Sequence, residues 1–72
     1  MTEKELSEKL AEMYNNAIKG ESVAMIHLFG IKYSEQIKEY STKEIVERSG
    51  LRPSYSTEVS KGIKLAKFVT IK

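Results

Sequence analysis

The chain has 72 residues, of which 40% are hydrophobic and 31% charged, with a net charge of +2 and no cysteine. This length predicts one domain spanning residues 1–72, and the lack of cysteine excludes disulfides and thiolate-bound metals. The sequence has neither an apolar run near the roughly 20 residues of a membrane span nor a signal-peptide pattern, so it predicts a cytoplasmic location without membrane contact.

The first predicted helix begins at Thr2. Thr2 and Glu5 have the spacing of a capping box, in which each side chain accepts a hydrogen bond from a backbone N–H of the first turn. Apolar residues then recur three and four positions apart, as on one face of a helix. They are Leu6, Leu10, Met13, Tyr14, Ala17 and Ile18. Gly20 is the expected end of this helix.

A second helix is predicted to start near Ser22, with the apolar run from Val23 to Phe29 making it the most buried one. Gly30 should break or kink this helix, because glycine costs about 1 kcal/mol relative to alanine inside a helix. Residues 31–39 can form a further turn or two. A short helix should follow from Ser41, paired with Glu44 in a second capping box, and stop at Gly50.

The next helix is predicted to have Pro53 in its first turn, where the missing N–H of proline is not needed. Helical spacing divides its residues between two opposite faces. One face holds Tyr55, Val59, Gly62, Ile63 and Ala66, and the other holds Thr57, Ser60, Lys61 and Lys64. Two helices joined by a turn that contains glycine have the general plan of a helix-turn-helix unit.

The C-terminal part of the chain is basic. Residues 1–47 contain six Lys and nine Glu, whereas residues 48–72 contain two Arg and four Lys against Glu58 alone. Such asymmetry indicates an anionic partner, above all nucleic acid, although a solvated basic surface is the alternative. The terminal residues Phe68 to Ile71 favour β-structure, so they are expected to form a short strand that either packs on the helices or pairs across a homodimer.

The stretch STKEIVERSGLRPSYSTEVSKG, residues 41–62, resembles the helix-turn-helix core of the phage-repressor or Xre-like family. In this resemblance Ile45 and Val59 take buried positions and Gly50 takes the turn. Arg52 stands where a helix cap is usual, so Ser54 is expected to cap the second helix instead. The resemblance implies an all-α bundle of four or five helices that contains a helix-turn-helix-like unit.

The same resemblance implies binding to double-stranded DNA, with the helix that begins near Pro53 in the major groove. Short polar side chains would reach base edges and basic ones would meet phosphates. The expected DNA-binding residues are Arg52, Ser54, Tyr55, Thr57, Ser60, Lys61 and Lys64. For Tyr55 a packing role is an equal alternative, because its spacing to Val59 places both on one face.

The rival interpretation is a protein-interaction module that keeps the helical fold without binding DNA. Ser56, at a position that the family fills with an aliphatic residue, and Glu58, a carboxylate near the expected phosphates, favour this rival. His27 is the only histidine and lacks partners for a metal site. No nucleophile, phosphate loop or cofactor motif is present, so the sequence predicts neither an enzyme nor a cofactor or small-molecule substrate.

Overall fold

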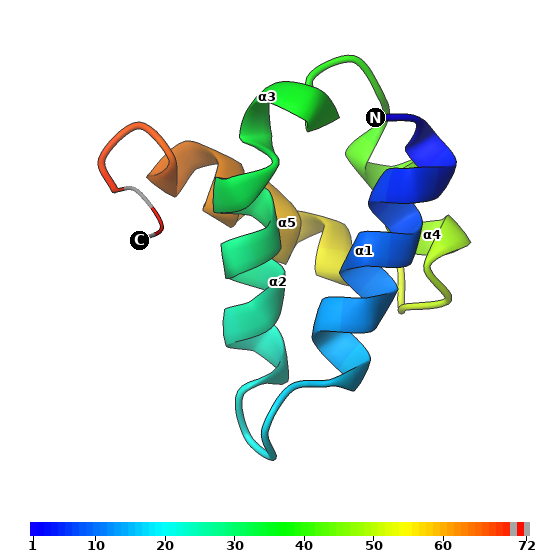
Figure 1. Ribbon diagram of the computed structural model, residues 1–72, viewed down its shortest axis with the longest axis vertical. Helices are drawn as coiled ribbons and strands as arrows, with labels where there is room; N and C mark the ends of the chain where they lie inside the picture. Colours follow the sequence, from blue (N-terminus) through cyan, green and yellow to red (C-terminus); the bar gives the residue numbers. More distant parts are fainter. Residues whose placement is uncertain (70, 72) are drawn as a thin grey trace.

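This computed structural model describes residues 1–69 and 71, and this part of the chain contains five helices and no strand (Figure 1). The helices are α1 (Glu3–Asn15), α2 (Ser22–Lys32), α3 (Ser34–Ile37), α4 (Thr42–Arg48) and α5 (Tyr55–Leu65). The prediction of an all-α bundle with four or five helices is therefore confirmed.

The N-terminus of α1 has the predicted capping box. The Thr2 backbone N–H donates to Glu5 Oε1 at 2.8 Å, and the Glu5 N–H donates to Thr2 Oγ1 at 3.1 Å. The C-terminus of α1 was predicted too far along the chain: the helix ends at Asn15, and Ile18 is 72% exposed in the loop that follows. Gly20 does not cap α1 but supplies a positive φ of 89° in this loop.

The predicted break at Gly30 is wrong, because α2 runs through this residue to Lys32. The helix ends instead at Tyr33, which is both the C-terminal cap of α2 and the residue before α3. Gly30 is buried, and its contacts, described below, explain why the helix tolerates it. Residues 34–37 then form the short predicted turn, α3.

The helix-turn-helix-like unit consists of α4, the turn from Ser49 to Ser54, and α5. The Ser41 hydroxyl accepts from the Glu44 N–H at 3.3 Å and begins α4, as predicted. Gly50 ends the unit's first helix with a φ of 84°, a conformation that other residues rarely adopt. The Arg52 and Pro53 carbonyls accept from backbone N–H groups three residues later, and α5 proper begins at Tyr55.

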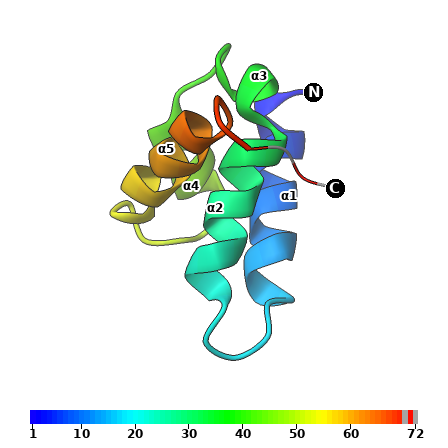
Figure 2. The ribbon, with the colours of Figure 1, turned by 90° about the vertical axis from the view of Figure 1, so that its left-hand side faces the viewer.

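The helices pack in two layers. α1 and α2 are antiparallel neighbours joined by the loop at one end of the molecule, and α4 and α5 lie against one side of this pair (Figures 1 and 2). One core unites the layers, and every helix contributes to it. Its buried members are Leu6, Leu10, Ile26, Phe29, Ile37, Ile45, Val46 and Val59. The predicted burial of Ile45 and Val59 is confirmed.

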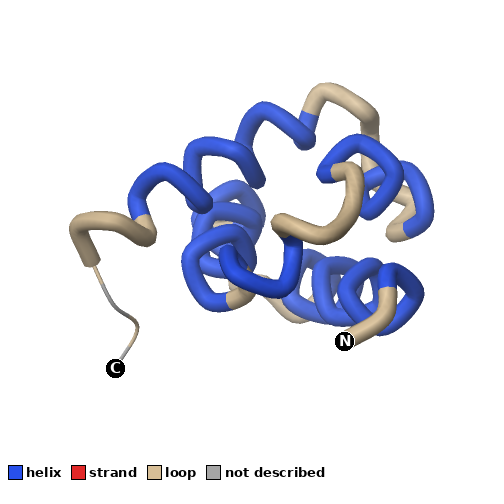
Figure 3. The backbone as a smooth tube through the Cα atoms, turned by 90° about the horizontal axis from the view of Figure 1, so that it is seen from above, coloured by secondary structure: helices blue, strands red, loops and turns tan. Residues whose placement is uncertain are grey.

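The C-terminal segment leaves the bundle beyond α5 (Figure 3). Residues 66–68 form a turn, and Val69 and Ile71 have no regular secondary structure. The described residues therefore contain no C-terminal strand, while Thr70, in the middle of the predicted strand, lies outside them. The side chain of Phe68 is 82% exposed, so it does not pack on the helices as the first of the two alternatives expected.

Candidate nucleic-acid interface

Two glycines set how closely α5 packs on α2. A Cβ atom added to Gly30 would lie 2.5 Å from the Val59 carbonyl oxygen and 3.0 Å from the Gly62 Cα. A Cβ added to Gly62 would overlap the His27 carbonyl oxygen. The two backbones are thus in direct contact, and any side chain at either glycine would push the helices apart. This contact fixes the position of α5 on the bundle.

The two faces of α5 differ in burial as the sequence predicts. Val59 and Gly62 are buried on the inner face, with Tyr55, Ile63 and Ala66 half-buried beside them. On the opposite face Thr57, Lys61 and Lys64 are exposed and Ser60 is half-buried. Ser56 is half-buried at the edge of the inner face, so no buried hydroxyl lacks a partner there. The outer face of α5, defined by Thr57, Ser60, Lys61 and Lys64, is therefore open to a ligand.

The turn before α5 adds two further exposed residues, Arg52 and Ser54. Ser54 does not cap the helix: it has helical backbone angles, and its side chain makes no capping hydrogen bond. This part of the prediction is wrong, because the turn of i to i+3 hydrogen bonds before Tyr55 already satisfies the first N–H groups. A hollow of about 440 Å³ lies beside the turn, lined by Tyr14, Asn15, Gly50, Leu51, Arg52 and Tyr55.

Tyr55 has the packing role that the sequence left open. Its ring lies 5.6 Å from the ring of Tyr14 on α1, centroid to centroid, and both rings pack against the core. The two hydroxyl oxygens are 3.4 Å apart. This hydrogen bond to Tyr55 raises the pKa of Tyr14 above its ordinary value. Tyr55 therefore joins the start of α5 to α1, and it also lines the hollow beside the turn.

Glu58 lies between α5 and α2, where it forms hydrogen bonds to two basic groups. Its Oε1 is 3.0 Å from His27 Nε2 and its Oε2 is 3.3 Å from Lys61 Nζ. These hydrogen bonds, first to His27 and then to Lys61, lower the pKa of Glu58. The carboxylate side chain is only 21% exposed and turned toward α2, so it is partly withdrawn from the outer face of α5.

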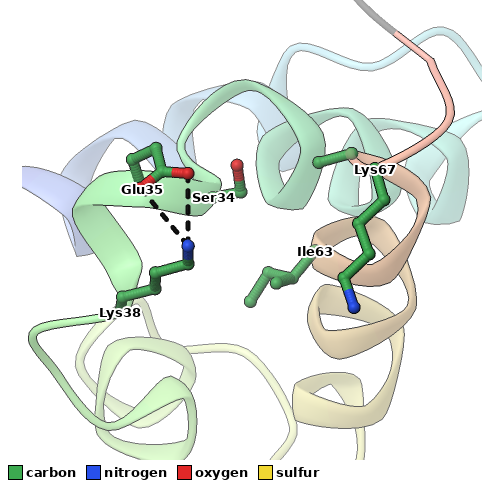
Figure 4. Close-up of a pocket in the computed structure, with 6 residues that line it drawn as sticks. Ser34, Glu35, Lys38, Ile63 and Lys67 are labelled. Atoms are coloured by element: carbon green, nitrogen blue, oxygen red, sulfur yellow. Dashed lines mark hydrogen bonds and ion pairs between the residues drawn. The ribbon is translucent and has the colours of Figure 1, made fainter.

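Another hollow, of about 210 Å³, separates α3 from the end of α5 (Figure 4). Glu35 is the only carboxylate in its lining, and it binds Lys38 with an Nζ–Oε1 distance of 3.2 Å. In residues 1–69 and 71, no three His, Cys, Asp or Glu side chains are grouped so that they could hold a metal ion.

Three partnerships in this region had no signal in the sequence. Gly30 meets Gly62, His27 meets Glu58, and Tyr14 meets Tyr55, each across more than 30 positions of the chain. Helical spacing shows which side of a helix a residue occupies, but not which residue of another helix lies opposite it.

No helix in the described part of the chain is long and apolar enough to cross a bilayer.

Comparison with known proteins agrees with this geometry at the level of the family. No curated protein and no solved structure matches the chain. A family model described as an HTH-like domain matches residues 2–72, which includes all five helices described above. This description covers helix-turn-helix-like domains in general and does not name the phage-repressor or Xre-like family. The chain belongs to the HTH-like domain family.

Proposed function

We propose that the chain is a non-enzymatic DNA-binding domain, acting in transcriptional regulation or another nucleic-acid-linked system, that places the outer face of α5 in the major groove of double-stranded DNA. The observation that supports this proposal most is the division of α5 into a buried inner face and an exposed outer face with two lysines. The single core, with members from every helix, supports a domain that spans residues 1–72.

In this proposal each exposed residue has a distinct task. Lys61 and Lys64 neutralise phosphates, and Thr57 and Ser60 reach base edges. Lys61 exchanges part of its contact with Glu58 for a phosphate oxygen when DNA binds. Arg52 and Ser54, in the turn before α5, meet the backbone beside the groove, and the Tyr55 hydroxyl contributes from the adjacent hollow.

A single module of this size makes few contacts with DNA. We propose that a homodimer or attachment to a larger assembly supplies further contacts, since linked modules bind with a higher effective concentration.

The plan of residues 41–62 remains similar to that of the phage-repressor or Xre-like family, and a location in the cytoplasm agrees with this function.

The salt dependence of binding to duplex DNA tests the proposal. Each phosphate that a lysine neutralises releases condensed counterions, so the logarithm of affinity should fall linearly with the logarithm of salt concentration, with a slope of about −0.9 per phosphate. Replacing Lys61 and Lys64 by alanine should flatten this slope by roughly 2 units and weaken binding to all sequences alike. Fluorescence anisotropy with labelled duplexes at several salt concentrations measures both quantities.

Two further variants complete the test. Thr57→Ala should cost about 1–3 kcal/mol at one base position and leave the salt slope almost unchanged, because it removes a base contact. The matched control replaces Lys4 and Lys9, two exposed lysines of α1, by alanine. This control changes the net charge equally and should leave the slope nearly as it is. Equal effects of the two lysine pairs, or no binding at low salt, would refute DNA binding by α5.

The second candidate function is a protein-interaction module without DNA binding. The observation that favours it is the position of Glu58, whose carboxylate lies 3.3 Å from Lys61 and competes with a phosphate for this lysine. A wild-type chain that ignores duplex DNA at low salt would favour this candidate.

A further inference from the structure

The surface next to the outer face of α5 is apolar. A hollow of about 330 Å³ lies between α2 and the end of α5, lined by His27, Lys61, Lys64, Leu65 and Phe68. Leu65 is 43% exposed and Phe68 is 82% exposed at its edge. Exposed phenylalanine and leucine beside a concave surface are typical of protein-binding sites, because solvated apolar patches are otherwise kept small.

An exposed apolar residue of α2 lies on the His27 side of that helix. Val23 lies one helical turn before His27 and is 41% exposed, so helical spacing places it on the His27 side of the helix. The hollow is thus lined by His27 of α2 and by the apolar residues Leu65 and Phe68, with Val23 one turn away along α2. This arrangement suits an amphipathic helix, which inserts side chains spaced by three and four residues into a groove.

The charge around the hollow determines the kind of partner. Its rim holds Lys61 and Lys64. Residues 59–72 contain four lysines and no acidic residue. The nearest carboxylate, Glu58, is already bound to His27 and Lys61. A second copy docked on this same hollow by two-fold symmetry would bring two basic surfaces together, which is unfavourable, whereas an acidic partner would pair with the lysines.

We propose that the hollow between α2 and α5 binds an acidic amphipathic helix of a partner protein. Apolar side chains of this helix enter the hollow beside Leu65 and Phe68, and its carboxylates pair with Lys61 and Lys64. The partner and DNA then compete for the same two lysines. This competition rests on the proposed function, whereas the docking site itself does not.

The probe is a labelled synthetic helical peptide with leucines three and four residues apart on one face and glutamates on the flanks. A second peptide carries lysine in place of each glutamate. The acidic peptide should bind the wild-type chain, and the basic one should not. Phe68→Ser should weaken binding about tenfold or more, as expected for the loss of a central aromatic contact. Replacing Lys61 and Lys64 by glutamine should also weaken it.

The control is Ile18→Ser, which removes another largely exposed apolar side chain (72%, against 82% for Phe68) from the loop between α1 and α2. It should leave peptide affinity unchanged, and circular dichroism should show that both serine variants fold. Equal binding of both peptides, or equal effects of the two serine substitutions, would overturn the proposal. So would dimerisation of the free chain that Phe68→Ser abolishes in sedimentation experiments, or binding to phosphatidylserine vesicles without binding to the peptide.

Competition with DNA separates this proposal from the proposed function. Adding the acidic peptide should weaken binding of the wild-type chain to duplex DNA. The Phe68→Ser variant should bind DNA as wild type does, and the peptide should not weaken this binding. Peptide binding that depends on Phe68 in a chain that ignores DNA would keep the docking site and remove only the competition. DNA binding without peptide binding would keep the proposed DNA-binding function and refute the docking site.

Discussion

Single residues determine the geometry of α5 through contacts that involve backbone as well as side chains. Gly30 and Gly62 bring two helix backbones together, and the Glu58 carboxylate bridges the same pair of helices through His27. The cost of glycine inside a helix, about 1 kcal/mol relative to alanine, is therefore offset by close packing. Both features can be tested by conservative substitutions.

Gly62→Ala should destabilise the chain although alanine is the better helix former. The new methyl group would overlap the His27 carbonyl oxygen, which belongs to the backbone and cannot rotate away. Such overpacking costs about 1–3 kcal/mol. Urea denaturation measures the loss, and Lys64→Ala, at an exposed position of α5, should stay within about 0.5 kcal/mol of wild type. A Gly62→Ala variant as stable as wild type would contradict the close approach.

The stability of the chain should fall in acid partly because of Glu58. Its pKa is lowered in the folded chain from the ordinary 4.5 by hydrogen bonds to His27 and Lys61. A lowered folded pKa stabilises the fold above the unfolded pKa, and this contribution is lost as the pH falls through the folded pKa. The difference in stability between Glu58→Gln and wild type should therefore shrink as the pH falls below the ordinary pKa of 4.5 and through the lowered folded pKa. Denaturation at several pH values tests this, with the exposed Glu8→Gln as the control.

At the scale of the helix, α5 depends on one buried side chain of its inner face, Val59. Val59→Asp would bury a carboxylate among apolar residues, which should cost several kcal/mol and unfold a domain of this size. Thr57→Asp introduces the same group on the exposed face and should remain folded. Circular dichroism and thermal unfolding distinguish the two. A folded Val59→Asp chain would show that α5 is not docked on the core.

The sequence predicts helices well where local chemistry decides them. Capping residues at Thr2 and Ser41 mark the starts of α1 and α4, and the 3.6-residue period separates the inner from the outer face of α5. Prediction fails where distant contacts decide. Gly30 was expected to break α2, but Gly62, 32 positions away, makes a glycine favourable there.

The candidate site shows the same division. The exposure of Thr57, Lys61 and Lys64 follows from helical spacing, because Val59 fixes the buried side. The apolar stripe of the first helix gave a wrong prediction at its end: Ala17 and Ile18 continue the period, yet α1 ends at Asn15. The orientation of Tyr55 depends on Tyr14 of another helix, which no local pattern reveals.

At the scale of the whole molecule, one core should give one unfolding transition. All five helices contribute to the same cluster of eight buried apolar residues. Helix content measured by circular dichroism and tyrosine fluorescence, to which the Tyr14–Tyr55 pair between α1 and α5 contributes, should therefore change together in urea. Separate transitions would show that the unit of α4 and α5 folds independently of the α1–α2 pair, and that residues 1–72 are not one domain.

The contact of Gly30 with Gly62 also limits the movements open to the bundle. Helices that meet through long side chains can slide, since rotamers adjust to a new register. Here a shift of α5 by one residue along α2 would place a Cβ atom of Lys61 or Ile63 where only a hydrogen atom fits. The α2–α5 pair has one register, so the two helices move together as a rigid unit. A ligand that binds the outer face of α5 therefore meets a helix whose orientation is that of the whole bundle, because α5 does not move relative to α2.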